Sequence, residues 1–345
     1  MKNYMDGGEA IVEAFRRLDI DYVMASPGSE WGSVWEAFAR QAKERSKGPE
    51  YLSCAHETLA VNLAMGYTAF TGRMQAVMLH TGVGLLQGSM GIDAANRAGL
   101  PMVVVSGESQ TYSEQGGFEP GPQWHGVLSV VGGPSSLVDR ITKWSQPVSS
   151  PHTLHEQLIR AGEMAQRSPP GPVYMSIPIE TMLHGWTPPQ NPRKVPPAPK
   201  PAPPSTDIEA VADMLLTSKA PAIVAESIGR DPAGYAATIE LADLLAIPVS
   251  ECRWLDFTNF PKDHPMYQGM GEPEYLHDSD VVLTLRARAP WTPPSAKPAK
   301  AKIVNIDETP FRPHMVHQSL QADIFLEGDA VATLKSLVAV IREKG

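Results

Sequence analysis

The fold of this chain is decided by residues 51–67, Tyr51-Leu52-Ser53-Cys54-Ala55-His56-Glu57-Thr58-Leu59-Ala60-Val61-Asn62-Leu63-Ala64-Met65-Gly66-Tyr67. The stretch opens as a short apolar strand, and a helix follows directly from Glu57. Because α/β folds bind ligands outside the carboxyl ends of their strands, Glu57 lies beside the expected ligand site. The alternative interpretation of Glu57 is an acid in a first helical turn, which the helix macrodipole stabilises by roughly 0.3–1 kcal/mol. The order of the surrounding elements favours the ligand site.

Strands and helices alternate on both sides of this stretch. Such alternation predicts a parallel sheet covered on both faces. An irregular Gly/Pro-rich stretch covers residues 114–126. The elements predicted in the first half are helices over 9–18, 31–38, 57–70 (closed by Gly72), 85–96 and 153–167, and strands at 22–25, 51–55, 76–79, 102–105 and 173–177.

Residues 187–206 mark the clearest domain boundary, with nine prolines, three basic residues and no acidic residue. This composition favours extended polyproline II and so a semi-rigid spacer; the alternative is a proline-rich recognition motif. Beyond it we expect helices over 207–217, 234–246 and 329–343, and strands near 222–225, 281–285 and 302–306. The predicted fold class is therefore α/β, with two doubly wound parallel-sheet domains, 1–186 and 207–345, joined by the linker 187–206.

Length and composition limit the classes of protein. At 345 residues the chain suggests two domains, and 42% hydrophobic with 19% charged residues is typical of a soluble globular protein. The net charge of −9 argues against a nucleic-acid or anionic-membrane partner, because either needs a basic surface. Cys54 and Cys252 lie far apart, which favours a reducing compartment. With no apolar leader and no span of about 20 apolar residues, we expect a cytoplasmic protein.

Short blocks of the first half carry a resemblance to a known family. In order and spacing they resemble the pyrimidine-binding domain of thiamine diphosphate (ThDP) enzymes, in the acetohydroxyacid synthase and benzoylformate decarboxylase group. Residues 221–225, 245–249 and 302–307 resemble, more loosely, the central domain of the same family. The blocks of the first half are Gly8-Glu9-Ala10-Ile11-Val12, Ser26-Pro27-Gly28-Ser29-Glu30, His56-Glu57, Gly66-Tyr67, Thr71-Gly72-Arg73, Thr81-Gly82-Val83-Gly84, Pro101 and Gly107.

The resemblance implies bound ThDP, activated by Glu57. Glu57 matches the family glutamate whose carboxyl group is hydrogen-bonded to the aminopyrimidine and cycles its proton, a task for which only Glu or Asp is suited. Gly82 and Gly84 permit close approach of a ligand, although they also suit any tight βα turn. The residues expected to contact the cofactor are Pro27, Gly28, Glu57, Thr81, Gly82 and Gly84.

Three further residues are candidates for contact with substrate. His80, in Leu79-His80-Thr81, resembles the histidine of benzoylformate decarboxylase and would move protons on substrate-derived intermediates; the alternative is a strand-end histidine satisfied by a backbone carbonyl. Ser29 matches the family serine that binds a substrate carboxylate, or else it is a helix N-cap. His125 would reach the pocket from its loop, or else it is solvated. No spacing of histidines and cysteines indicates a metal site.

The sequence lacks two family motifs. Family members hold the diphosphate through Mg²⁺ with a Gly-Asp-Gly motif and a downstream Asn pair in a third domain, and this sequence contains neither. We therefore expect a partner chain to hold Mg²⁺ and diphosphate, in a hetero-tetramer or larger assembly. Bound FAD is not expected, because residues 225–229 and 285–288 replace the glycine run and Gly-x-Arg segment of nucleotide-binding members.

The resemblance implies cleavage or formation of a C–C bond next to a carbonyl. His80 favours a 2-oxo acid decarboxylase or lyase, with Glu57 and His80 as its catalytic residues. One alternative is an acetolactate-synthase-like carboligase, and another is a non-catalytic regulatory or scaffold paralogue. A nicotinamide-dependent dehydrogenase is a remote third alternative, because the glycines from Gly82 to Gly88 do not have the dinucleotide-binding spacing.

Overall fold

A computed structural model describes residues 5–108 and 130–345 and divides the chain into two compact units, residues 1–198 and 199–345. The division falls within the proline-rich segment, where residues 186–204 form neither helix nor strand. Helix α9 (Ser205–Thr217) begins before residue 207, where the sequence pattern placed its start. The limits 1–186 and 207–345 stay predictions. The irregular stretch 114–126 lies outside the described residues.

The first unit is built on a six-stranded parallel sheet with the order β2-β1-β3-β4-β6-β5. The chain passes from β1 outward to β2 and then returns to β3 on the other side of β1, so the order reverses between β1 and β3. This pairing sets Ser26 opposite Leu79, and a further pairing sets Leu79 opposite Ser106. The strands are β1 (Tyr22–Ser26), β2 (Glu50–Ser53), β3 (Gln75–Leu79), β4 (Met102–Glu108), β5 (Trp144–Pro147) and β6 (Pro172–Pro178).

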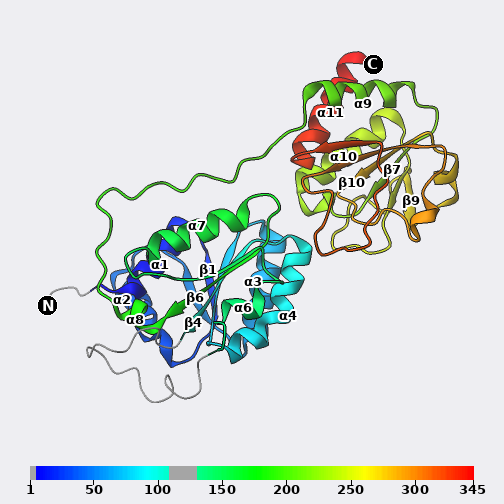
Figure 1. Ribbon diagram of the computed structural model, residues 1–345. Coiled ribbons are helices and arrows are strands. Elements are labelled where there is room, and N and C mark those ends of the chain that lie inside the picture. The colour runs from blue at the N-terminus through cyan, green and yellow to red at the C-terminus, as the bar shows by residue number, and fades with distance from the viewer. Residues whose placement is uncertain (1–4, 109–129) are drawn as a thin grey trace. The chain divides into compact units, whose positions relative to one another are not determined.

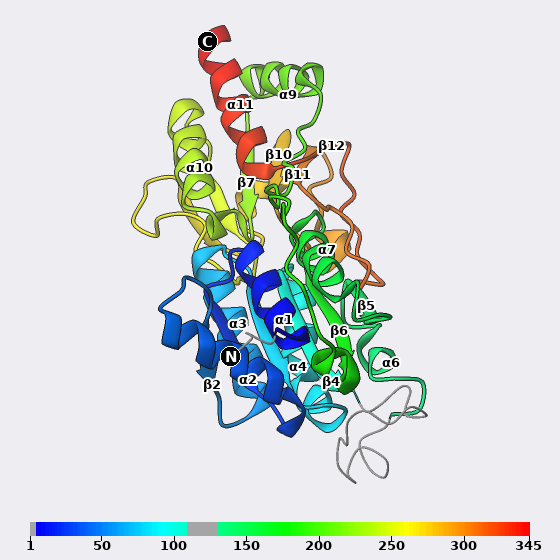
Figure 2. The same ribbon diagram turned by 90° about the vertical axis from the view of Figure 1, so that its left-hand side faces the viewer.

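Helices cover both faces of this sheet, as Figures 1 and 2 show. Successive strand residues point to opposite faces, so Ala76 and Met78 of β3 join one apolar cluster while Val77 and Leu79 join the other. The first cluster packs under α1 (Gly7–Arg17), α2 (Gly32–Glu44), α7 (Leu154–Gln166) and α8 (Ile179–Leu183), and the second under α3 (Glu57–Thr71), α4 (Val83–Ala98) and α6 (Ser135–Val138).

The helix that follows β2 matches its prediction closely. Helix α3 begins at Glu57 and ends before Gly72, which has a φ of 71° and caps the helix as glycine commonly does.

Other elements differ from their predictions. Helix α4 begins at Val83, earlier than the predicted Leu85, with Gly82 as its N-cap residue. The short elements β5, α6 and α8 were not predicted, since four or five residues give too little periodicity.

The second unit is also a six-stranded parallel sheet, with the order β12-β11-β10-β7-β8-β9. Two parallel-sheet α/β domains are therefore confirmed. Helices α9, α10 (Pro232–Leu245) and α11 (Ala330–Lys344) pack in one apolar cluster, whereas the cluster on the other face contains Leu276 of η3 (Glu274–Asp278) and Trp291. The strands are β7 (Pro221–Ala225), β8 (Val249–Glu251), β9 (Tyr267–Met270), β10 (Val281–Leu285), β11 (Lys302–Asp307) and β12 (Ile324–Glu327).

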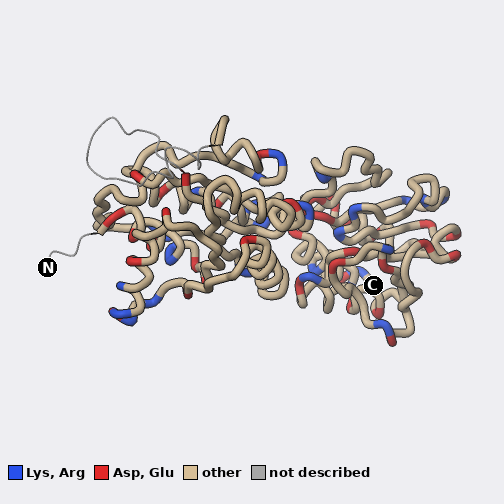
Figure 3. The backbone as a smooth tube through the Cα atoms, turned by 90° about the horizontal axis from the view of Figure 1, so that it is seen from below, with Lys and Arg blue, Asp and Glu red and all other residues tan. Residues whose placement is uncertain are grey.

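Two further findings, on charge and on helix hydrophobicity, concern the kinds of partner this chain could have. Acidic and basic residues are interspersed along the described backbone of both units (Figure 3). Across residues 5–108 and 130–345, no helix is both long and apolar enough to cross a bilayer. The predicted cytoplasmic location and the absence of a nucleic-acid partner stay predictions.

Candidate functional site

The candidate site lies at the carboxyl ends of four adjacent strands. Glu57 follows β2, Glu30 follows β1, His80 follows β3, and Gly107 lies near the end of β4. In open α/β sheets the ligand crevice forms at the carboxyl edge where the strand order reverses. That reversal falls between β1 and β3, so the strand order brings these residues to one place.

Glu57 is the first residue of α3 and is largely buried. Its side chain is 17% exposed, and His56 directly before it caps the helix by accepting a hydrogen bond of 3.1 Å from the Thr58 amide. Among the described residues, the polar neighbour of the Glu57 carboxylate is His56 Nδ1, at 4.0 Å from Oε2. The carboxylate therefore keeps its hydrogen-bonding capacity open.

Gly84 lies against both Glu57 and His80. A Cβ at Gly84 would lie 3.0 Å from Glu57 Oε1 and 2.8 Å from His80 Cβ. A hydrogen bond of 2.8 Å from Thr58 Oγ1 to the Gln87 carbonyl ties α3 to α4 beside this contact. Gly84 was expected to admit a ligand, and in the structure it admits these two side chains.

The turn between β3 and α4 is shaped by Thr81 and Gly82. Gly82 has a φ of 48°, in the region that favours glycine. Thr81 is buried, and its amide donates a hydrogen bond of 3.2 Å to Glu30 Oε1. Its Oγ1 is also buried and has no hydrogen-bond partner among the described residues. Since an unmade buried hydrogen bond costs free energy, this hydroxyl is a candidate contact for a ligand.

His80 is bound to a carboxylate. Its Nδ1 lies 2.8 Å from Glu30 Oε1 and 3.0 Å from Oε2, so the alternative of an imidazole satisfied by a backbone carbonyl is wrong. The hydrogen bond to Glu30 raises the pKa of His80 against the opposing effect of burial, and the charges of Glu30 and Glu57 act in the same direction as the hydrogen bond.

Glu30 is the residue of this site to which the sequence patterns assigned no role. Its side chain is fully buried. A Cβ at Gly28 would lie 2.0 Å from His80 Nδ1, and a Cβ at Gly107 would lie 2.4 Å from Glu30 Cγ, so the pair occupies space that two glycines leave free. The signal in the sequence was an acid shortly after a strand, but its link to His80 depends on β1 and β3 being neighbours.

The structure gives less information on three other predicted site residues, Ser29, Pro27 and His125. Ser29 is exposed and begins the 3₁₀ helix η1 (Ser29–Trp31) next to Glu30. Neither η1 nor α2 has a side-chain cap bond, so the interpretation of Ser29 as an N-cap is wrong. Pro27 is half-buried between β1 and η1. His125 lies outside the described residues.

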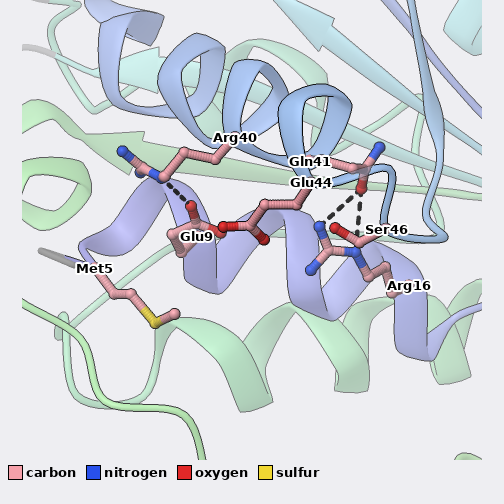
Figure 4. A pocket seen from close by; sticks show the side chains of 7 residues that line it. All are labelled: Met5, Glu9, Arg16, Arg40, Gln41, Glu44 and Ser46. Carbon is pink, nitrogen blue, oxygen red and sulfur yellow. Dashed lines mark hydrogen bonds and ion pairs between the residues drawn. The ribbon is translucent and has the colours of Figure 1, made fainter.

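A pocket elsewhere in the first unit does not contain the predicted residues. It has a volume of about 100 Å³ and lies between α1, α2 and the turn that follows α2 (Figure 4). Glu9 and Arg40 form an ion pair in it, and Arg16 Nη2 donates to Gln41 Oε1 at 2.7 Å. Arg40 Nη2 is buried without a hydrogen-bond partner among the described residues. The lining residues are Met5, Glu9, Arg16, Arg40, Gln41, Glu44 and Ser46.

The strand ends of the second unit carry ion pairs formed by the unit's own side chains. Arg286 follows β10 and has a φ of 46°. Its Nε donates to Glu308 Oε2 at 2.9 Å, and its Nη1 donates to Asp231 Oδ2 at 2.6 Å. Arg288 pairs with the buried Glu226. These residues stand where the sequence departs from the nucleotide-binding pattern, and the expectation of no bound FAD stays a prediction.

Comparisons with known proteins identify both units. Residues 5–129 match the thiamine pyrophosphate enzyme N-terminal binding domain, and residues 208–337 match the central domain of thiamine pyrophosphate enzymes (thiamine pyrophosphate is another name for ThDP). The chain is 23% identical to the acetolactate synthase large subunit of Haemophilus influenzae, over 99% of this chain and 59% of that protein. It is 25% identical to a benzoylformate decarboxylase of Pseudomonas aeruginosa, over 96% of this chain and 61% of that protein.

A solved structure shows the same fold. Benzoylformate decarboxylase from Polynucleobacter necessarius aligns with a TM-score of 0.80 at 22% identity, over 97% of this chain and 61% of that one. The chain thus spans about 60% of the length of these proteins.

Proposed function

The chain belongs to the thiamine pyrophosphate enzyme family, and we propose that it supplies the pyrimidine side of the ThDP site in a 2-oxo acid decarboxylase or lyase. The observation that carries this proposal is the close packing at Gly84, which lies against both the Glu57 carboxylate and the His80 side chain. An acid and a histidine held together at the reversal point of a parallel sheet suit proton transfer on a bound ligand.

The residues present fit the aminopyrimidine part of ThDP. The Glu57 carboxylate has open hydrogen-bonding capacity, and the buried Thr81 Oγ1 lacks a partner among the residues the structure describes. When bound, ThDP supplies a carbon nucleophile and the electron sink for a C–C bond next to a carbonyl. Pro27, Gly28 and Gly82 would line the same edge of the sheet.

The proposed roles follow from the chemistry of each side chain. Glu57 accepts and returns a proton at its carboxylate, held in place by the start of α3. His80 holds or releases a proton at Nε2, since its Nδ1 is occupied by Glu30. The exposed Ser29 hydroxyl donates a hydrogen bond to a substrate carboxylate. His125 is kept as a further candidate substrate contact.

The diphosphate side of the site is proposed to come from a second chain. The matched domain models are the N-terminal and central ones, and the sequence contains no Gly-Asp-Gly segment for Mg²⁺. We propose that the partner's diphosphate-binding domain holds Mg²⁺ and diphosphate, in a hetero-tetramer or larger assembly. The two cysteines are free and buried, which suits the proposed cytoplasmic location.

The rival function is carboligation of the acetolactate synthase type. It is supported by the similarity to the acetolactate synthase large subunit. The pairing of His80 with Glu30 favours decarboxylation or another C–C bond cleavage, because an imidazole fixed in place by a carboxylate can deliver a proton to the product. Product analysis with a 2-oxo acid, alone and with a second 2-oxo acid as acceptor, separates the two.

Glu57→Gln tests the proposal in the enzyme assembled with its diphosphate-binding partner. The amide keeps a hydrogen bond but cannot exchange the proton, so we expect turnover to fall by about 10²–10⁴-fold, as for a missing acid–base group. The control is Glu50→Gln, which removes an exposed carboxylate at the opposite end of β2. If Glu57→Gln keeps more than about a tenth of the wild-type rate, the role of Glu57 is wrong.

Calorimetry tests the proposed division between chains. The purified chain is titrated with ThDP and Mg²⁺ with and without the partner. We expect weak binding by the chain alone and tight binding in the assembly. Tight binding by the isolated chain would overturn the proposal that a second chain holds the diphosphate.

A further inference from the structure

We propose that Glu30 is a positioning residue of this site: it fixes a proton on Nδ1 of His80, favours the cationic form of the ring and leaves Nε2 free for an anionic substrate. This inference rests on the function proposed above and deepens it, because it assigns the charge and orientation of the histidine that would meet a 2-oxo acid.

The geometry decides which nitrogen carries the proton. The Glu30 side chain is 0% exposed, and both its oxygens lie within 3.0 Å of His80 Nδ1. An ionised carboxylate only accepts hydrogen bonds, so Nδ1 must be the donor. The Thr81 amide donates to Oε1 as a second partner, at 3.2 Å.

The burial of Glu30 favours a charged ring. A buried carboxylate is costly unless it is paired with a cation. Among the contacts that the structure gives the Glu30 carboxylate, the Thr81 amide is neutral and the His80 ring is the group that can carry charge. The hydrogen bond to Glu30 raises the pKa of His80, and Glu57, the acid that faces the ring from α3, adds to it.

Two glycines leave room for the pair. A Cβ at Gly28 would lie 2.0 Å from His80 Nδ1 and 2.3 Å from Glu30 Oε2, and a Cβ at Gly107 would lie 2.4 Å from Glu30 Cγ. The ring and the carboxylate therefore fill the space where two side chains would otherwise stand.

The other ring nitrogen is available for a ligand. The His80 side chain is 25% exposed, and Nε2 has no hydrogen-bond partner within residues 5–108 and 130–345. A protonated Nε2 binds a carboxylate through a charge-assisted hydrogen bond and can then release its proton. The pair thus combines recognition of an anion with delivery of a proton.

The test follows the His80 ring by NMR in the purified full chain labelled with ¹³C and ¹⁵N at histidine. His80 is assigned from the spectrum of His80→Gln. In wild type we expect the His80 midpoint above 6.5, and above that midpoint the ¹⁵N shifts should show the remaining proton on Nδ1. In Glu30→Gln, which keeps an acceptor for Nδ1–H but removes the charge, the midpoint should fall. Glu36→Gln, which removes an exposed carboxylate from α2, should leave it unchanged.

The outcomes separate this inference from the proposed function. A His80 midpoint that stays in place in Glu30→Gln overturns the inference. So does a wild-type neutral ring protonated on Nε2, a result that does not depend on the folding of Glu30→Gln. In the assembled enzyme, we expect Glu30→Gln to raise KM for the 2-oxo acid and to move the basic limb of kcat/KM to lower pH. The NMR result does not require ThDP, so it stands even if the assembled enzyme proves inactive toward 2-oxo acids.

Discussion

Nδ1 of His80 and Oε1 of Glu30 lie 2.8 Å apart, joining the ends of two neighbouring parallel strands. The two residues are 50 positions apart in the chain. His80 and Glu57 both lie against Gly84, so we expect a change of charge at the His80–Glu30 pair to affect both the stability of the first unit and the candidate chemistry.

Stability should depend on pH through His80. Its pKa in the folded chain is raised above the ordinary 6.5, chiefly by the Glu30 hydrogen bond, so the folded state binds the proton more tightly. This contribution is fully present below about pH 6.5 and is lost as pH rises through the folded-state pKa. Urea unfolding of wild type and His80→Gln should therefore give curves whose difference shrinks as pH rises above 6.5. A difference independent of pH would contradict the ion pair, and His152→Gln at an exposed histidine serves as the control.

Gly84→Ala and Gly66→Ala should have opposite effects. An added Cβ at Gly84 would press on His80 Cβ at 2.8 Å and Glu57 Oε1 at 3.0 Å, and such overpacking typically costs about 1–3 kcal/mol. At Gly66, inside α3, nothing lies within 4 Å, so alanine should stabilise by about 0.5–1 kcal/mol. Denaturant unfolding measures both, and turnover of the assembled enzyme should fall only for Gly84→Ala. Equal stability of the two variants would show that the Gly84 contact is not tight.

His80 and Glu57 should affect different steps. We expect His80→Ala to slow turnover while exchange of the cofactor's C2 proton with deuterium stays close to wild type, because His80 serves the substrate. Glu57→Gln should slow both by about 10²-fold or more. Exchange followed by NMR in the assembled enzyme, alongside steady-state rates, measures the difference. Unchanged turnover in His80→Ala would favour the carboligase alternative, and equal slowing of both steps would place His80 in cofactor activation.

In the second unit, Arg286→Leu should be strongly destabilising. The Arg286 side chain is 12% exposed and binds Glu308 and Asp231, so its removal takes the guanidinium from both carboxylates and leaves the charge of the partly buried Glu308 without this cation. Removing one partner of a buried pair costs about 3–5 kcal/mol, and the exposure of Glu308 places this case near the lower value. Lys300→Leu, in an ion pair with Asp278 whose side chains are 74% and 84% exposed, should change stability by less than about 0.5 kcal/mol. Chemical denaturation of the two variants, with the units' transitions resolved, checks the contrast.

Patterns among neighbouring residues were enough to predict much of the fold. The start of α3 at Glu57 and its end before Gly72 follow from a strand-to-helix junction and a glycine in the left-handed region, both readable from adjacent residues. The two parallel sheets follow from the alternation of strands and helices. Short edge elements such as β5 escaped prediction because their stability comes from pairing within the sheet and not from their own periodicity.

The sequence by itself determined the alternation of elements, the family, and Glu57 and His80 as candidate catalytic residues. Only the tertiary structure decided that Glu30 is the partner of His80 and that Gly28 and Gly107 leave the space for both side chains. The physical reason is that local sequence patterns set each strand and helix, whereas contacts between strand ends depend on strand order. β1 and β3 lie side by side because the chain reverses direction across the sheet at that point, and no local pattern records that reversal.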